Sequence, residues 1–165
     1  MAFRPYWLDA SALVKLVHQE TGSKHVRRVV GRESWFETTW LCVAEAYGVL
    51  KRLLNKGRIA PNDYHKKLST LRSWIDSGRI TVRLEWLLPG KKGPDKTIFV
   101  REFAKKHGLD FSDAIQFFEL TQGAISAVAG KSVPVVVSSD RKLLAAARKL
   151  GHKVWDPEKD EEPPS

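Results

Sequence analysis

The sequence predicts a single α/β domain built on a central, mainly parallel sheet with helices on both faces. Short apolar stretches typical of strands alternate with longer stretches of helical spacing, and this alternation favours parallel strands joined by helical crossovers. A length of 165 residues gives one domain room for one core. No apolar run approaches the roughly 20 residues of a membrane-spanning helix, and the N-terminus lacks the apolar segment of a signal peptide.

The first half of the chain holds two short strand candidates, each followed by helices. Tyr6–Leu8 is apolar, and the residues after it have leucine and valine at helical spacing. Ser34–Glu37 is the second strand candidate, and Thr38 and Thr39 supply a cap for a long helix that Gly57 closes. The helices expected in this half cover residues 10–18, 23–30, about 40–56 and 61–77.

The second half contains three more strand candidates, of which Val133–Asp140 (VPVVVSSD) is the clearest. Pro89–Lys96 (PGKKGPDK) is a basic, turn-rich loop and a candidate RNA contact. The other elements expected here are strands at 79–84 and 152–156, a helix that ends near 107, and helices at 110–120 and 141–150. We expect the domain to cover residues 1–156 and the acidic, proline-containing segment 157–165 to be disordered.

The charge of the chain is strongly basic and unevenly distributed. Lys and Arg number 28 against 19 Asp and Glu, which gives a net charge of +9 and a pI near 9.8, although the C-terminal segment is acidic. A basic body of this kind is the electrostatic footprint expected of a nucleic-acid binder, although many basic proteins bind only acidic partners or nothing. The single cysteine, Cys42, excludes an internal disulfide and a multi-cysteine zinc site, so we expect a cytoplasmic protein.

Two acids are expected at the edge of the sheet where ligands bind in open parallel sheets. Asp9 follows the first strand and Asp140 follows the strand VPVVVSS; Ser11 and Ser138 lie within two residues of them. Each acid also begins a helix, so N-capping explains it at a gain of about 0.5–2 kcal/mol. Asp110 has the same two interpretations, with capping favoured.

Glu45 is not explained by capping, because it lies well inside the long helix. Its neighbours at helical spacing include Leu41, Cys42 and Val49, so we expect it on the apolar, buried face. A buried carboxylate without a partner or a metal costs several kcal/mol. A buried ion pair or a hydrogen-bonded core carboxylate is the structural alternative.

Asp113 completes a set of four acids from four separated segments. Its position in the first turn of a helix also fits an interaction with the helix dipole. Carboxylates brought together repel one another unless a divalent cation compensates them, and oxygen ligands suit Mg²⁺ or Mn²⁺. Such ions can activate water for phosphodiester hydrolysis, with Ser11 and Ser138 binding metal-bound water or a phosphate.

The motifs LDASALVKL, CVAEAYGVL, FSDAIQ and VVVSSDRKL, in this order, resemble the PIN domain and most closely the VapC-type toxin ribonucleases. The resemblance covers Tyr6 to about Trp155. It implies a PIN-like α/β/α sandwich, an Mg²⁺ or Mn²⁺ site, an RNA substrate, a homodimer and an antitoxin partner. Carried over by position, the metal-binding acids are Asp9, Glu45, Asp113 and Asp140, and the auxiliary hydroxyls are Ser11 and Ser138.

The resulting expectation is a metal-dependent endoribonuclease acting as the toxin of a toxin–antitoxin pair. The alternative is a PIN-fold RNA-binding or RNA-processing module outside such a pair, without hydrolysis. A haloacid-dehalogenase-like phosphatase is disfavoured, because the DAS motif lacks the second aspartate of those enzymes. For two further residues, we expect Lys15 to face a phosphate or a partner and Glu37 to be a solvated strand end.

Overall fold

Five parallel strands form the centre of the molecule. The structure is a computed structural model that describes residues 4–33, 35–83, 96–121 and 133–164. The strands pair in the order β3-β2-β1-β4-β5, all parallel. Their bounds are β1 Tyr6–Leu8, β2 Phe36–Thr39, β3 Ile80–Arg83, β4 Val135–Val137 and β5 Val154–Trp155. The predicted parallel sheet is therefore confirmed.

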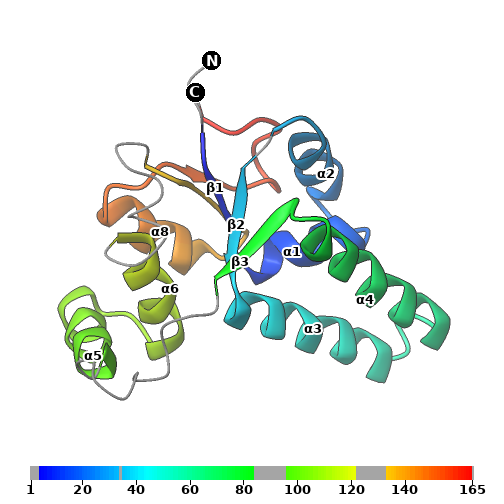
Figure 1. Cartoon of the computed structure of the whole chain (residues 1–165), viewed down its shortest axis with the longest axis horizontal. Coiled ribbons are helices and arrows are strands. Elements are labelled where there is room, and N and C mark those ends of the chain that lie inside the picture. Colours follow the sequence, from blue (N-terminus) through cyan, green and yellow to red (C-terminus); the bar gives the residue numbers. More distant parts are fainter. Residues whose placement is uncertain (1–3, 34, 84–95, 122–132, 165) are drawn as a thin grey trace.

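Helices cover both faces of this sheet (Figure 1). In that view α1 to α4 lie on one side of the strands, and α5, α6 and α8 lie on the other. Their bounds are α1 Ala10–Val17, α2 Ser23–Arg32, α3 Trp40–Asn55, α4 Pro61–Asp76, α5 Lys96–His107, α6 Phe111–Thr121 and α8 Arg141–Lys149. The order of elements matches the prediction, and the predicted ends differ by a few residues, as is usual for helix and strand termini.

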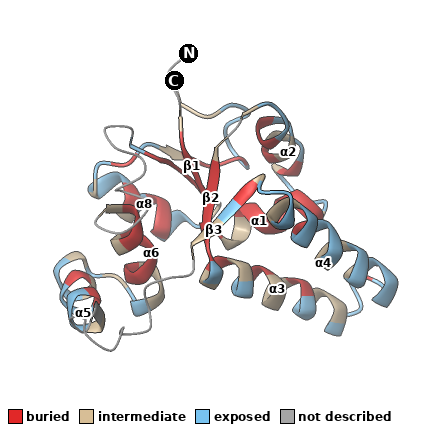
Figure 2. Ribbon diagram, viewed as in Figure 1, coloured by how far each residue is buried: buried red, intermediate tan, exposed pale blue. Residues whose placement is uncertain are grey.

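Strands β1 and β4 are buried on both faces, which explains why they are continuous apolar runs rather than alternating ones. Every residue of β1 and of β4 is buried, and the large side chains of Trp7 and Trp155 lie in the core. Figure 2 shows this buried centre and the exposed outer faces of α3 and α4. Leu8 pairs with Val137, so β1 and β4 end side by side. The chain segments that follow these two strands therefore meet at one edge of the sheet.

The C-terminal segment differs from its expected disorder. Residues 156–164, here called the C-terminal clasp, lie against α1 and α2. The carbonyl oxygen of Pro157 is 2.5 Å from the point that a Cβ on Gly22 would occupy, and Gly22 has a φ of +80° that favours glycine. Charge explains the difference, because the acidic clasp faces a basic helix. Arg28 and Arg32 of α2 both pair with Glu162.

Two charged side chains have structural roles instead of the expected ones. Lys15 is buried, and its Nζ lies 2.7 Å from carboxylate oxygens of both Glu20 and Glu158, so it faces the clasp rather than a phosphate. Glu37 is also buried and accepts hydrogen bonds from both Nε and Nη2 of Arg83 on the neighbouring strand. Neither expectation from the sequence anticipated these pairs.

The basic loop Pro89–Lys96 falls almost entirely outside the described residues, so its expected contact with RNA stays a prediction. Within the described ranges, every helix is too short or too polar to span a bilayer.

Candidate functional site

Asp9 begins the site at the point where β1 becomes α1. It is the N-cap of α1, and its Oδ1 accepts hydrogen bonds from the backbone of Ala12 at 2.9 Å and from Ser11 Oγ at 2.8 Å. Its Oδ2 accepts a bond of 2.6 Å from Ser138 Oγ. Burial raises the pKa of Asp9, and these hydrogen bonds oppose the rise. The capping role expected for Asp9 is confirmed, and its carboxylate is held rigidly.

The segment after β4 is tied to Asp9 through two serine hydroxyls. Ser138 is fully buried, and its Oγ also accepts the backbone N–H of Asp140 at 2.9 Å. The backbone N–H of Ser139 donates to Ser11 Oγ, also at 2.9 Å. The Ser138 hydroxyl therefore restrains both Asp9 and Asp140 from the core side of the site. Its burial does not fit the direct contact with metal-bound water or phosphate that the sequence suggested, whereas Ser11 is partly exposed.

Asp140 caps α8 as expected. Its Oδ1 accepts hydrogen bonds from the backbone N–H groups of Lys142 and Leu143, at 2.7 and 3.1 Å. The side chain is exposed, so the carboxylate remains open to ligands. Asp110 accepts the backbone N–H of Asp113 at 2.8 Å, which confirms the favoured capping interpretation for that residue.

Glu45 is exposed, so the expectation that it is a buried acid is wrong. The buried face of α3 is a narrow stripe of Cys42, Ala46 and Leu50, spaced four residues apart. Glu45 lies beside this stripe at its edge, and its Oε1 accepts a hydrogen bond of 3.0 Å from Ser112 Oγ at the start of α6. The carboxylate therefore faces the space between two helices instead of the core.

Asp113 is the acid most affected by its neighbours. Burial raises its pKa, and the negative charges of Asp110, Asp140, Glu45 and Asp9 raise it further, to about 6. All the predicted acids are thus close enough to Asp113 to repel its ionised form. A cation placed among them would reverse this effect.

All four predicted acids line one open cavity of about 470 Å³ at the carboxyl edge of the sheet. They come from β1–α1, α3, α6 and the start of α8. The complete lining is Asp9, Ala10, Ser11, Glu45, Gly48, Val49, Arg52, Asp113, Gln116, Asp140 and Leu143. The structure thus brings together five of the six predicted site residues, and Ser138 supports them from the core.

Two further polar residues of this cavity lie outside the predicted set of site residues. Arg52 is exposed and lies seven residues after Glu45, two turns along the same helix. Gln116 lies three residues after Asp113, and its Oε1 accepts a hydrogen bond from Cys42 Sγ. Helical spacing from the two predicted acids would have found both, because residues three, four and seven apart share a face.

The donor chemistry of the cavity fits a hard divalent cation. Its lining offers four carboxylates and no imidazole or thiol, and the Cys42 thiol is buried with a pKa of about 12. Oxygen donors of this kind suit Mg²⁺ or Mn²⁺. Among the described residues, however, no group of three or more His, Cys, Asp or Glu side chains is spaced to hold an ion. The acids match a metal in type and charge, although no three of the described ones are arranged to coordinate it in this structure.

Comparison with known proteins identifies the fold. The crystal structure of PAE2754 from Pyrobaculum aerophilum is similar, with a TM-score of 0.55 and 24% sequence identity over 87% of this chain and 79% of that chain. No protein-family model matches the chain. No curated protein sequence matches it either. At this identity the likeness shows a shared fold only, and a shared fold does not determine function. Together with the observed sheet order, it gives the chain a PIN-like α/β fold.

Proposed function

We propose that the protein is a metal-dependent endoribonuclease. Asp9, Glu45, Asp113 and Asp140 bind Mg²⁺ or Mn²⁺, and the reaction is hydrolysis of a phosphodiester bond in RNA. The observation that carries the proposal is the convergence of these four acids, from four separated segments, on one cavity. Burial and the neighbouring negative charges together raise the pKa of Asp113, as expected for a site that requires a cation.

Different side chains of the protein have different roles in such a site. A bound divalent ion would activate water and stabilise the charge of the leaving oxygen. Asp9 is held by Ser11 and Ser138, so it presents its carboxylate in one orientation. Arg52 lines the same cavity, with Nη1 only 3.6 Å from the point that a Cβ on Gly48 would occupy. In this proposal its guanidinium binds the phosphate that the acids alone would repel.

A second candidate function is RNA binding without hydrolysis. It is favoured by the arrangement of the acids, because no described group of three is arranged to hold an ion. Metal binding separates the two candidates. A nuclease binds Mg²⁺ or Mn²⁺ at the acids and cleaves RNA. A binding module binds RNA but neither binds the metal at the acids nor cleaves the RNA.

The test combines calorimetric titration of Mn²⁺ with cleavage of labelled RNA. Glu45→Gln is the main variant, because Glu45 is exposed and its loss leaves the core intact. We expect a reduction in cleavage of roughly 100-fold or more, at least as large as the effect of losing a residue that supports a metal ligand. Glu102→Gln, an exposed acid on α5, is the matched control and should cleave normally. Equal cleavage by both variants and the unmodified chain would overturn the assigned site.

We also propose that this activity belongs to the toxin of a toxin–antitoxin pair, that the chain forms a homodimer, and that a small antitoxin protein is its partner. These proposals extend the resemblance of the four motifs to VapC-type toxins. Expression of the unmodified chain should arrest growth, and the Glu45→Gln chain should not. Growth at a normal rate with active enzyme present would remove the toxin assignment and leave the ribonuclease.

A further inference from the structure

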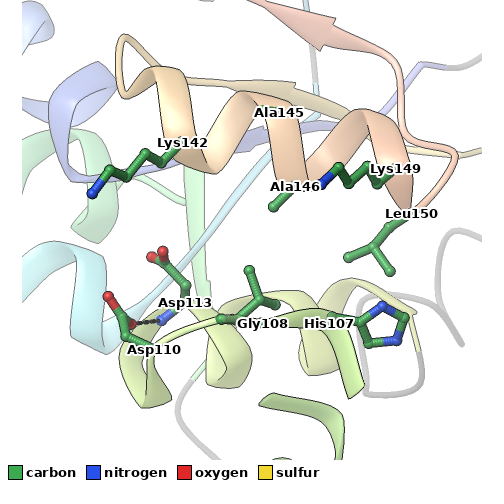
Figure 3. Close-up of a pocket in the computed structure, with 10 residues that line it drawn as sticks. His107, Gly108, Asp110, Asp113, Lys142, Ala145, Ala146, Lys149 and Leu150 are labelled. Atoms are coloured by element: carbon green, nitrogen blue, oxygen red, sulfur yellow. Dashed lines mark hydrogen bonds between the residues drawn. The ribbon is translucent and has the colours of Figure 1, made fainter. Parts of the chain in front are cut away.

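A second cavity adjoins the acidic one and differs from it in charge. It has a volume of about 440 Å³ and lies between the start of α6 and one face of α8 (Figure 3). Its lining is His107, Gly108, Leu109, Asp110, Asp113, Lys142, Ala145, Ala146, Lys149 and Leu150. Asp113 lines both cavities, so the two are neighbours at this residue.

Lys142 and Lys149 give this second cavity its positive side. They are seven residues apart on α8, which places them on one face and about 10 Å apart along the helix axis. Figure 3 shows Lys142 above the acids of α6 and Lys149 further along the helix. Both side chains are exposed, and neither forms an ion pair with a residue that the structure describes.

The wall between the two lysines is small and apolar. Ala145 lies there with Ala146, and Leu150 lies at the far end of the helix. Such a wall leaves room for the sugar and base of a nucleotide, while the lysines approach the backbone on either side. Extended anions with regularly spaced charges match this arrangement better than a small compact anion.

An RNA strand that binds in the acidic cavity requires cations close to its phosphates. An RNA strand that enters it meets four carboxylates, and every flanking phosphate is repelled unless a cation lies nearby. Arg52 supplies a positive charge on the α3 side of the acids. Lys142 and Lys149 supply two on the α8 side. The three cations thus mark a path that passes over the acids from one helix to the other.

We propose that the cavity between α6 and α8 binds the part of the RNA strand that adjoins the cleaved bond, with Lys142 and Lys149 each contacting a backbone phosphate. The proposal rests on the proposed function, because it concerns the substrate of the same site. The contacts are to phosphates, so they hold the strand in place and do not read its sequence.

The test measures binding of labelled single-stranded RNA in EDTA, where metal-dependent cleavage cannot occur. The test variant is Lys142→Ala with Lys149→Ala. The control is Lys24→Ala with Lys66→Ala, which removes the same charge from exposed positions on α2 and α4. We expect the test variant to lose roughly tenfold or more in affinity at low salt. Its slope of log affinity against log salt should fall by about 1–2, because two phosphate contacts are lost.

Cleavage kinetics provide an independent measurement with metal present. The test variant should raise KM with a smaller effect on kcat, as expected for contacts made in both the bound and the reacting state. A parallel titration with single-stranded DNA of the same sequence separates the phosphate contacts, which both strands share, from contacts to the RNA sugar. Loss of the lysines should weaken both strands.

Two results would overturn the proposal. One is an equal loss of affinity in the test and control variants, which would assign the effect to net charge. The other is unchanged RNA binding and KM in the test variant. If the unmodified chain binds RNA through these lysines and never cleaves it, the nuclease assignment fails and the binding path stands. If it cleaves RNA normally without the lysines, the path fails and the nuclease stands.

Discussion

Charged side chains occur in both the acidic cavity and the C-terminal clasp, but their charges are compensated in different ways. In the clasp, burial acts to lower the pKa of Lys15, but the hydrogen bonds and charges of Glu158 and Glu20 outweigh it and raise the pKa. In the cavity, burial and four like charges raise the pKa of Asp113, and no described cation pairs with it. The clasp neutralises charge within the chain, and the cavity leaves it for a ligand.

The difference shows how to separate structural from functional charge in this molecule. Lys15, Arg28 and Arg32 each have a clasp carboxylate as a partner of opposite sign, so these contacts are complete without a further molecule. Asp9, Glu45 and Asp140 of the cavity accept hydrogen bonds from hydroxyl or backbone donors, but all the acids of the cavity share one sign. A site that is electrostatically incomplete alone is the stronger candidate for binding.

The two regions are physically connected. Lys15, which pairs with Glu158 of the clasp, lies on α1, as does Ser11, whose Oγ accepts the backbone N–H of Ser139 beside Asp140. Lys15 lies one turn after Ser11 on α1. The lysine that pairs with the clasp and the hydroxyl that contacts the segment after β4 therefore lie on the same helix.

The largest expected effect on stability comes from the centre of the clasp. Lys15→Ala removes a long, buried side chain, so we expect the free energy of unfolding to fall by about 3 kcal/mol, measured by urea denaturation. Lys15→Met keeps most of the volume and should recover much of the loss, because buried ion pairs are often replaceable by apolar residues. Lys24→Ala, on the exposed side of α2, should change stability little. An equal loss in Lys24→Ala would show that Lys15 is no more structural than a surface lysine.

Lys15 also shows which kind of contact the sequence does not predict. Its partner Glu158 lies 143 residues away, and a spacing pattern within one helix carries no information about such a contact. The prediction that Glu45 is buried was wrong for a related reason. The pattern placed it next to the apolar stripe of α3, but the width of the buried face depends on how α3 packs.

The fold and the position of the acids were more predictable because they depend on local signals. Continuous apolar runs predicted the buried parallel strands, and Asp9 and Asp140 followed them directly. Parallel strands place such residues at one edge of the sheet whatever the packing of the helices. The spacing of the carboxylates depends on side-chain packing across four segments, which no local pattern contains.

Ser138→Ala tests whether the hydroxyl behind the cavity matters to the site. The buried Oγ joins Asp9 Oδ2 to the backbone of Asp140, so its loss leaves both acids less restrained. We expect cleavage to fall by about 10–100-fold, as for residues that orient metal ligands. The free energy of unfolding should fall by about 1–3 kcal/mol, because a buried acceptor loses its donor. Ser138→Thr, which keeps the hydroxyl, should recover cleavage; full cleavage by the alanine variant would contradict the supporting role.

Asp113→Asn should have the opposite sign from the clasp variants. Asp113 is half-buried among like charges, so removing its charge should raise the unfolding free energy of the metal-free protein by up to about 1 kcal/mol. Its folded pKa of about 6 exceeds the ordinary value of 3.8, so the folded state binds the proton more tightly. Stability should therefore fall as pH rises from about 4 through about 6.

Metal and mutation should both remove this pH dependence, which urea denaturation at a series of pH values can measure. The amide introduced by Asp113→Asn does not titrate, and Mg²⁺ or Mn²⁺ favours the ionised form of the wild-type acid. Asp63→Asn, an exposed acid in the first turn of α4, is the control and should leave the pH dependence in place. A metal-free protein whose stability rises over the same pH range would contradict the repulsion between the acids.

The smallest effect is expected at the exposed end of the clasp. Glu162→Gln removes the partner of both Arg28 and Arg32, yet all three side chains are close to half exposed. Exposed ion pairs contribute little to stability and weaken with salt, so thermal unfolding should change little and the change should vanish at high salt. Glu158→Gln, which faces buried Lys15, should cost more and retain its effect in salt. If both variants behaved alike, burial would not distinguish the two ends of the clasp, and Lys15 would have to be compensated by Glu20 alone.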